Sequence, residues 1–131
     1  MSTLQVGTIK SASSAPPVFQ NSSGTEKGQL AKCWINYNGG RNGSFGIRDS
    51  FGVSSITDNG AGDHDVNWSI SFSAADYCVV SGANFATDDG GGRLFTSVRT
   101  QTTSKIQIVY IGDGGGFYDS ELSFVTAFGD N

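Results

Sequence analysis

The sequence predicts an all-β domain of the sandwich or barrel type, and three observations lead to this fold class. Apolar and polar residues alternate with a period of two in short segments such as VNWSISF at 66–72. Turn-forming pairs such as Asn59-Gly60 and Asp113-Gly114 separate these segments. No stretch keeps a helical period over three turns. The chain has 131 residues, which is enough for a single domain with its own core.

Nine segments have the composition and spacing expected of strands. They cover residues 3–10, 29–37, 44–49, 53–58, 66–72, 77–83, 93–100, 105–111 and 122–128. In three of them the alternation predicts a buried face, formed by Val66, Trp68, Ile70 and Phe72, by Ile106, Ile108 and Tyr110, and by Leu122, Phe124, Thr126 and Phe128. Trp34 and Phe45 are also expected in the core.

The first part of the chain differs from the rest and is expected to form an arm over residues 1–27, ahead of a sandwich domain over residues 28–131. A predicted strand at 3–10 is followed by a polar linker at 11–28, SASSAPPVFQNSSGTEKG, which contains both prolines. An isolated strand suggests pairing with a neighbouring subunit, although packing on its own domain is the simpler alternative. The apolar residues expected to serve assembly are Leu4, Val6, Ile9, Val18 and Phe19.

Charge and hydropathy argue against several partners. The net charge is −4 with few scattered Lys and Arg residues, so nucleic acid is not an expected partner. The first residues, MSTLQVGTIKS, contain no apolar core of a signal peptide. No apolar run approaches the roughly 20 residues that cross a bilayer, so membrane insertion is not expected. The protein is therefore expected to be made in a cytoplasm.

Two cysteines, Cys33 and Cys78, lie in apolar strand-like segments, AKCWI and YCVV. Buried free thiols are favoured over a disulfide in an oxidising compartment. Their spacing is not that of a zinc site, and no metal or cofactor is expected.

The segment TDNGAGDHD at 57–65 combines acidic residues with the only histidine. Asp58, Asp63 and Asp65 are weak candidates for calcium binding, but their spacing does not match an EF-hand loop. A hairpin turn between two strands is the favoured interpretation, with its polar side chains displayed to solvent. His64 is accordingly expected to be a solvent-exposed turn residue rather than a general base or a metal ligand.

Two glycine runs, DDGGGR at 88–93 and GDGGGFYD at 112–119, are interpreted as loops. No lysine follows the glycines as it does in a P-loop, and strands flank both runs. Asp88, Asp89, Asp113 and Asp119 are weak calcium candidates. With one histidine and no GxSxG motif, no catalytic arrangement can be assembled, so enzymatic activity is not expected.

Phe117 and Tyr118 lie at the edge of the second glycine run. An aromatic side chain at this position either anchors the loop, which is the more common case, or stacks on a sugar or a partner surface. Phe117 and Tyr118 are therefore candidates for contact with a sugar or a partner surface.

The order of these segments resembles a domain found in tailed bacteriophages, especially cyanophages and other marine phages. The resemblance rests on AKCWINYNG, on GSFGIRDSFGVSSITDNGAGDHDVNWSISF, on ADYCVVSGANF and on a last strand that ends in FGD, and it covers about residues 28–130. Its most specific part is IRDSFGVSSITDNGAGD. The domain usually lies at the distal end of tail-fibre or related virion proteins.

The resemblance implies an antiparallel, jelly-roll-like β-sandwich, association as a homotrimer, and location in a virion assembled in the host cytoplasm. It carries no catalytic residue and no cofactor to transfer. The implied function is a tail-fibre or receptor-binding subunit that contacts a host-surface glycan or protein. The alternatives are a decoration protein of the phage head, attached to other virion proteins through the N-terminal arm, and a free sugar-binding lectin.

Loops on a rigid sandwich are the expected contact regions, namely 59–65, 86–92 and 112–118. The residues selected as receptor contacts are Asn59, Asp63, His64, Asp88, Asp89, Arg93, Phe117 and Tyr118.

Overall fold

The computed structural model describes residues 4–10, 19–28, 30–84 and 94–129. The chain divides into two compact units, Met1–Leu30 and Ala31–Asn131, and each is considered by itself. Within the described ranges every regular element is a β-strand. The same ranges contain no helix long and apolar enough to cross a membrane.

The first unit contains a small hairpin of β1 (Phe19–Gln20) and β2 (Glu26–Gly28). Its turn is closed by the Asn21 side chain, whose Oδ1 accepts hydrogen bonds from the backbone N–H of Ser23 and Thr25. This hairpin lies within the segment 11–28 that was predicted to be a polar linker.

The predicted strand at 3–10 finds no partner strand within this chain over its described part. Residues 4–10 take part in no ladder with the other described strands, and the pairing of this segment with a neighbouring subunit stays a prediction. The apolar side chains expected to serve assembly, Leu4, Val6, Ile9 and Phe19, are exposed. Val18 lies outside the described residues.

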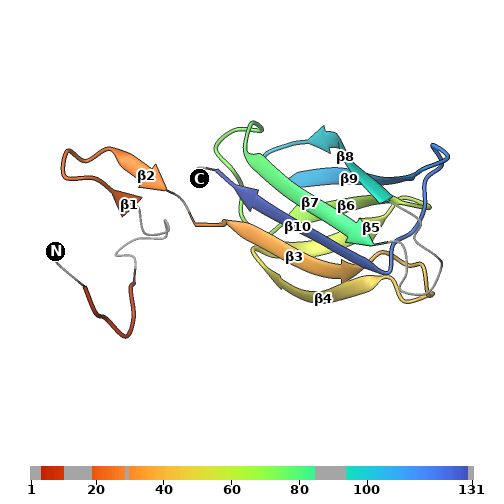
Figure 1. The fold of residues 1–131 in the computed structure, drawn as a ribbon, viewed down its shortest axis with the longest axis horizontal. Helices are drawn as coiled ribbons and strands as arrows, with labels where there is room; N and C mark the ends of the chain where they lie inside the picture. Colours follow the sequence, from red (N-terminus) through yellow and green to blue (C-terminus); the bar gives the residue numbers. More distant parts are fainter. Residues whose placement is uncertain (1–3, 11–18, 29, 85–93, 130–131) are drawn as a thin grey trace. The chain divides into compact units, whose positions relative to one another are not determined.

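The second unit is a β-sandwich of two antiparallel four-stranded sheets (Figure 1), which confirms the predicted fold class. The first sheet has the order β4-β3-β10-β7 and the second has the order β5-β6-β9-β8. The strands are β3 (Cys33–Asn38), β4 (Gly46–Phe51), β5 (Val53–Asp58), β6 (Asp63–Trp68), β7 (Cys78–Asn84), β8 (Leu94–Gln101), β9 (Lys105–Gly112) and β10 (Leu122–Phe128).

The chain crosses from the first sheet to the second at Gly52, the single residue between β4 and β5. Gly52 has φ of +70°, and an added Cβ would lie 2.8 Å from the Lys32 carbonyl oxygen. Only glycine fits such a backbone in so close an approach. The motif SFGVS is therefore a corner between the two sheets.

The core lies between the two sheets. Val66 and Trp68 of β6, and Ile106, Ile108 and Tyr110 of β9, are buried, as their alternation predicts. Phe72 follows β6 and is buried as well, whereas Ile70 is exposed. Phe45 packs against the core as a partly buried side chain.

Two strands of the first sheet have the opposite face buried from the one predicted. In β10 the residues packed inside are Ser123, Val125 and Ala127, while Phe124 is 43% exposed. In β3, Cys33, Ile35 and Tyr37 are buried and Trp34 is exposed. Both faces of these strands carry apolar residues, so period alone does not decide which one turns inward.

The two cysteines are free thiols, but only Cys33 is buried. Burial raises the pKa of the Cys33 thiol to about 11, with Lys32 acting in the opposite direction. Cys78 is exposed, contrary to prediction. It lines an open cleft of about 240 Å³ where β7 begins and β10 ends.

Candidate functional site

Three connections meet at one end of the sandwich, which we call the loop end. They join β3 to β4 (39–45), β5 to β6 (59–62) and β9 to β10 (113–121), and Figure 1 shows all three at the right of the sandwich. The Gly62 N–H donates to Asp119 Oδ1 at 2.7 Å, and the Arg41 N–H donates to the Ser120 carbonyl at 3.4 Å. The loop end is therefore built from segments that are far apart in sequence.

The turn at 59–62 forms where the sequence predicts it. The Gly60 N–H donates to Asp58 Oδ1, and the Asp63 N–H donates to the Gly60 carbonyl. Gly60 and Gly62 both have positive φ, at +127° and +60°. Asn59 is exposed at the tip of this turn.

His64 is fully buried, which overturns the prediction of a solvent-exposed turn residue. Strand β6 begins at Asp63, so the alternation of the strand turns the next side chain into the core. The imidazole packs against the rings of Phe45, Tyr110 and Tyr37, with centroids 5.0, 5.5 and 5.7 Å away.

Beneath the loops lies a buried hydrogen-bond network formed by Tyr37, His64, Tyr110, Ser120 and Ser123, which we call the buried network. The hydroxyls of Tyr37 and Tyr110 are 2.5 Å apart, and the Tyr37 hydroxyl is 3.4 Å from His64 Nδ1. Ser123 hydrogen-bonds to Ser120 and to both tyrosines. The network joins β3, β6, β9, β10 and the segment before β10.

Burial determines the protonation of this network. It raises the pKa of Tyr37 and Tyr110, so both remain neutral phenols. Burial lowers the pKa of His64, while Asp58, Asp119 and Asp63 act in the opposite direction. His64 Nε2 has no hydrogen-bond partner among the described residues and lies 3.9 Å from Asp119 Oδ1. A neutral network of this kind holds the loop end in one geometry.

Acid is expected to destabilise the protein through His64. The pKa of the native imidazole lies below its ordinary value of 6.5, so below that pH the unfolded chain takes up a proton that the native state does not. The free energy of unfolding should therefore fall from about pH 6.5 downward, by at most about 1.4 kcal/mol per pH unit, until the native pKa is reached.

Imidazole NMR signals over a pH titration, combined with urea unfolding at several pH values, test this expectation. His64 is the only histidine, so its signals are assigned without ambiguity. A native pKa of 6.5 or higher for His64 would contradict the expectation. This measurement uses the wild-type protein, so it does not depend on the stability of a His64 variant.

Two of the predicted contact residues at the second glycine run are exposed. Phe117 is 45% exposed and Tyr118 is 42% exposed. The Arg99 guanidinium lies 5.9 Å from the centre of the Phe117 ring, in a cation–π arrangement. The Tyr118 ring packs on the backbone of Gly112, where a Cβ would lie 2.8 Å from the ring. Gly112 is thus needed to seat the tyrosine, because a larger residue there would overlap its ring.

The other predicted contacts are placed differently. Asp63 and His64 are buried residues of β6 rather than parts of the turn. Asp88, Asp89 and Arg93 lie outside the described residues. The structure thus gathers Asn59, Phe117 and Tyr118 at the loop end.

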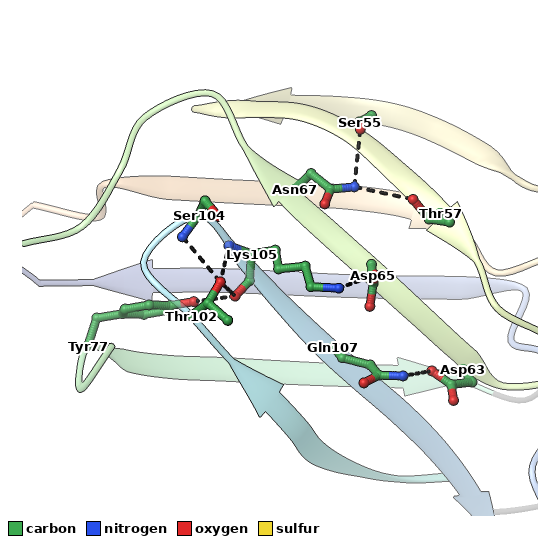
Figure 2. Close-up of polar contacts among 10 residues, drawn as sticks. All are labelled: Ser55, Thr57, Asp63, Asp65, Asn67, Tyr77, Thr102, Ser104, Lys105 and Gln107. Carbon is green, nitrogen blue, oxygen red and sulfur yellow. Dashed lines mark hydrogen bonds and ion pairs between the residues drawn. The ribbon is translucent and has the colours of Figure 1, made fainter. Parts of the chain in front are cut away.

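A second polar cluster lies on the outer face of the second sheet, and we call it the outer array. It consists of Asp63, Asp65 and Asn67 of β6, Arg99 of β8, and Lys105 and Gln107 of β9. Figure 2 shows Gln107 Nε2 donating to Asp63 Oδ1 and Lys105 Nζ donating to Asp65 Oδ2, both at 2.7 Å. The Arg99 Nη1 donates to Asp63 Oδ2 at 2.6 Å. At the other side of the array, Asn67 donates to the hydroxyls of Ser55 and Thr57.

Sequence reasoning missed Arg99, Lys105 and Gln107, although a signal was present. In KIQIVYI the polar Lys105 and Gln107 alternate with buried isoleucines, so they must share the outer face. Which residues they meet there depends on strand pairing, because Asp65 pairs with Gln107 and Asn67 pairs with Lys105 in the ladder.

The three weak metal candidates of the 57–65 segment, Asp58, Asp63 and Asp65, do not converge. Asp63 and Asp65 are engaged by cationic and amide groups on the outer face, and Asp58 accepts from the backbone of its own turn. In the part of the chain that the structure describes, no group of three or more His, Cys, Asp or Glu side chains is arranged to hold a metal ion.

Comparisons with protein-family models, with curated proteins and with solved structures found no match for this chain.

Proposed function

We propose that this protein is a non-enzymatic receptor-binding subunit of the tail-fibre type in a tailed-bacteriophage virion, and that its loop end contacts the host surface. The observation that carries the proposal is the gathering of Asn59, Phe117 and Tyr118, all exposed, above the buried network. Loops on a rigid scaffold are where binding modules carry their contacts.

The buried network supports this role through pre-organisation. Loops that are already held in one conformation lose less conformational entropy when they bind. A hydrogen bond between two of the loops adds to this pre-organisation. The Asp119 carboxylate accepts from the Gly62 N–H and so links the 113–121 connection to the 59–62 turn. Exposed aromatic side chains supply contact area with few torsions to immobilise.

The sequence resemblance supports the same role. Its most specific part, IRDSFGVSSITDNGAGD, covers β4, the Gly52 corner, β5 and the turn that leads into the loop end. A homotrimer would present three loop ends together, and simultaneous contact by linked copies strengthens weak individual contacts.

Cell binding by the full chain tests the proposal. Phe117→Ala combined with Asn59→Ala is expected to reduce binding of the fluorescently labelled protein to cyanobacterial host cells about tenfold or more, because exposed aromatic anchors dominate such contacts. Phe51→Ala is the matched control, since Phe51 is 60% exposed on β4 away from the loop end. Equal cell binding by the loop variant and the wild type would refute the assignment of the loop end.

A further inference from the structure

We propose that the outer array is a binding site for a neutral, hydroxyl-rich ligand, namely an uncharged oligosaccharide. The inference deepens the proposed function and rests on it for the source of the ligand, which would be a glycan of the host surface. It is carried by a juxtaposition on one sheet face of paired charges, amide groups and an aromatic ring.

The side chains of the array are held in place and keep further hydrogen-bonding capacity. Gln107 and Arg99 are each fixed by a hydrogen bond to Asp63. Each still has groups beyond those bonds, because a guanidinium has five N–H donors and an amide has a carbonyl acceptor. A sugar hydroxyl both donates and accepts, so it is suited to a surface that presents donors and acceptors side by side.

Asp65 holds Lys105 in place within the array. Asp65 is only 8% exposed, and its Oδ2 pairs with Lys105 at 2.7 Å. Its Oδ1 has no hydrogen-bond partner among the described residues. Because this oxygen is itself buried, the groups open to a ligand are those of Arg99 and Lys105, whose side chains are 54% and 38% exposed.

The charge of the array selects against an ionic ligand. Two carboxylates, Asp63 and Asp65, are matched by two cations, Arg99 and Lys105, at 2.6 and 2.7 Å. The array is therefore neutral in total, and a polyanion such as a sulfated glycan would have to compete with the aspartates for both cations. The chain as a whole carries a net charge of −4, which also repels an anionic ligand.

An apolar surface lies at one side of the array. Arg99 joins the array to Phe117, since it hydrogen-bonds to Asp63 and lies over the Phe117 ring. Phe117 is about half exposed and can pack against the C–H face of a sugar ring. Along β6 alone, Asp63 to Asn67 spans about 13 Å at about 3.3 Å per residue, which is wider than one monosaccharide.

A printed array of neutral and acidic oligosaccharides, probed with the labelled full chain, tests the proposal. We expect binding to neutral glycans, with binding to a positive spot reduced about tenfold in Gln107→Ala by the loss of its hydrogen bonds. Gln20→Ala is the matched control, because Gln20 is an exposed glutamine of β1 in the other unit. Thermal unfolding of each variant confirms that it is folded. NMR of the Gln107 and Asn67 side-chain amides should show shifts on addition of a bound glycan.

Three results would overturn the proposal: binding to no neutral glycan, binding confined to acidic glycans, or equal binding by Gln107→Ala and the wild type. For this comparison the loop variant carries Asn59→Ala alone, because Asn59 is not part of the outer array whereas Phe117 lies beside Arg99 and contributes to both sites. If the loop variant loses cell binding while no neutral glycan binds, the inference fails and the proposed function stands. If Gln107→Ala loses glycan binding while the loop variant still binds cells, the assignment of the loop end fails and the inference stands.

Discussion

Gly62→Ala is expected to lower the free energy of unfolding by about 3 kcal/mol, as the sum of backbone strain and overpacking. Gly62 has φ of +60°, a conformation that costs any residue with a Cβ. An added Cβ would also lie 2.6 Å from the Tyr118 nitrogen, 2.7 Å from its carbonyl oxygen and 2.9 Å from the Tyr110 carbonyl oxygen. All three are backbone atoms, so rotation of a side chain cannot relieve the close contacts.

The effect should extend to the loop end, because the Gly62 N–H donates to Asp119 and its carbonyl accepts from the Tyr110 N–H. Displacing Gly62 therefore disturbs the connection that carries Phe117 and Tyr118. We expect faster amide hydrogen exchange over residues 113–121 as well as a lower unfolding midpoint in urea.

Two glycines of the same loops separate the contributions to this effect. Gly60 has positive φ but open space around its Cα, so Gly60→Ala should cost only the backbone strain, about 1–2 kcal/mol. Gly114 has neither feature, and Gly114→Ala should be close to neutral. If all three variants unfold at the same urea concentration, the close packing of Gly62 is refuted.

Val125→Asp is expected to cost about 4 kcal/mol or more, because it places a charge without a partner in the core. Val125 is fully buried between the sheets. The adjacent Phe124→Asp should cost far less, since Phe124 faces outward and lies over Gly82 at the surface of the first sheet. The sequence prediction placed Phe124 in the core, so it expects the larger loss of stability from Phe124→Asp. Comparing the two variants therefore decides which face of β10 is buried.

Urea unfolding followed by tryptophan fluorescence measures both variants, because Trp68 lies in the core. If Val125→Asp does not fold at all, Val125→Ala and Phe124→Ala give the same comparison with smaller losses of stability. A greater loss from the Phe124 variant would show that the inner face of β10 has been assigned incorrectly.

The sequence by itself determined the fold class and much of the strand pattern, because those depend on local chemistry. β5 occupies the predicted residues 53–58, and the turn after it forms at Asn59-Gly60. Positive φ at glycine and the period of a pleated strand are properties of short segments, so they can be read without knowledge of distant residues. The inner face of β9 was predictable for the same reason, since apolar and polar residues alternate cleanly in KIQIVYI.

Only the tertiary structure decided which face of β10 is buried and what His64 does. Ser123 can face the core because its hydroxyl finds Ser120, Tyr37 and Tyr110, and Phe124 can face outward because Gly82 leaves room for its ring. His64 is buried because β6 starts one residue before it, opposite two tyrosines contributed by β3 and β9. In each case a polar side chain is stabilised by partners far away in the sequence, and the free energy of burying it depends on those partners rather than on its neighbours in the chain.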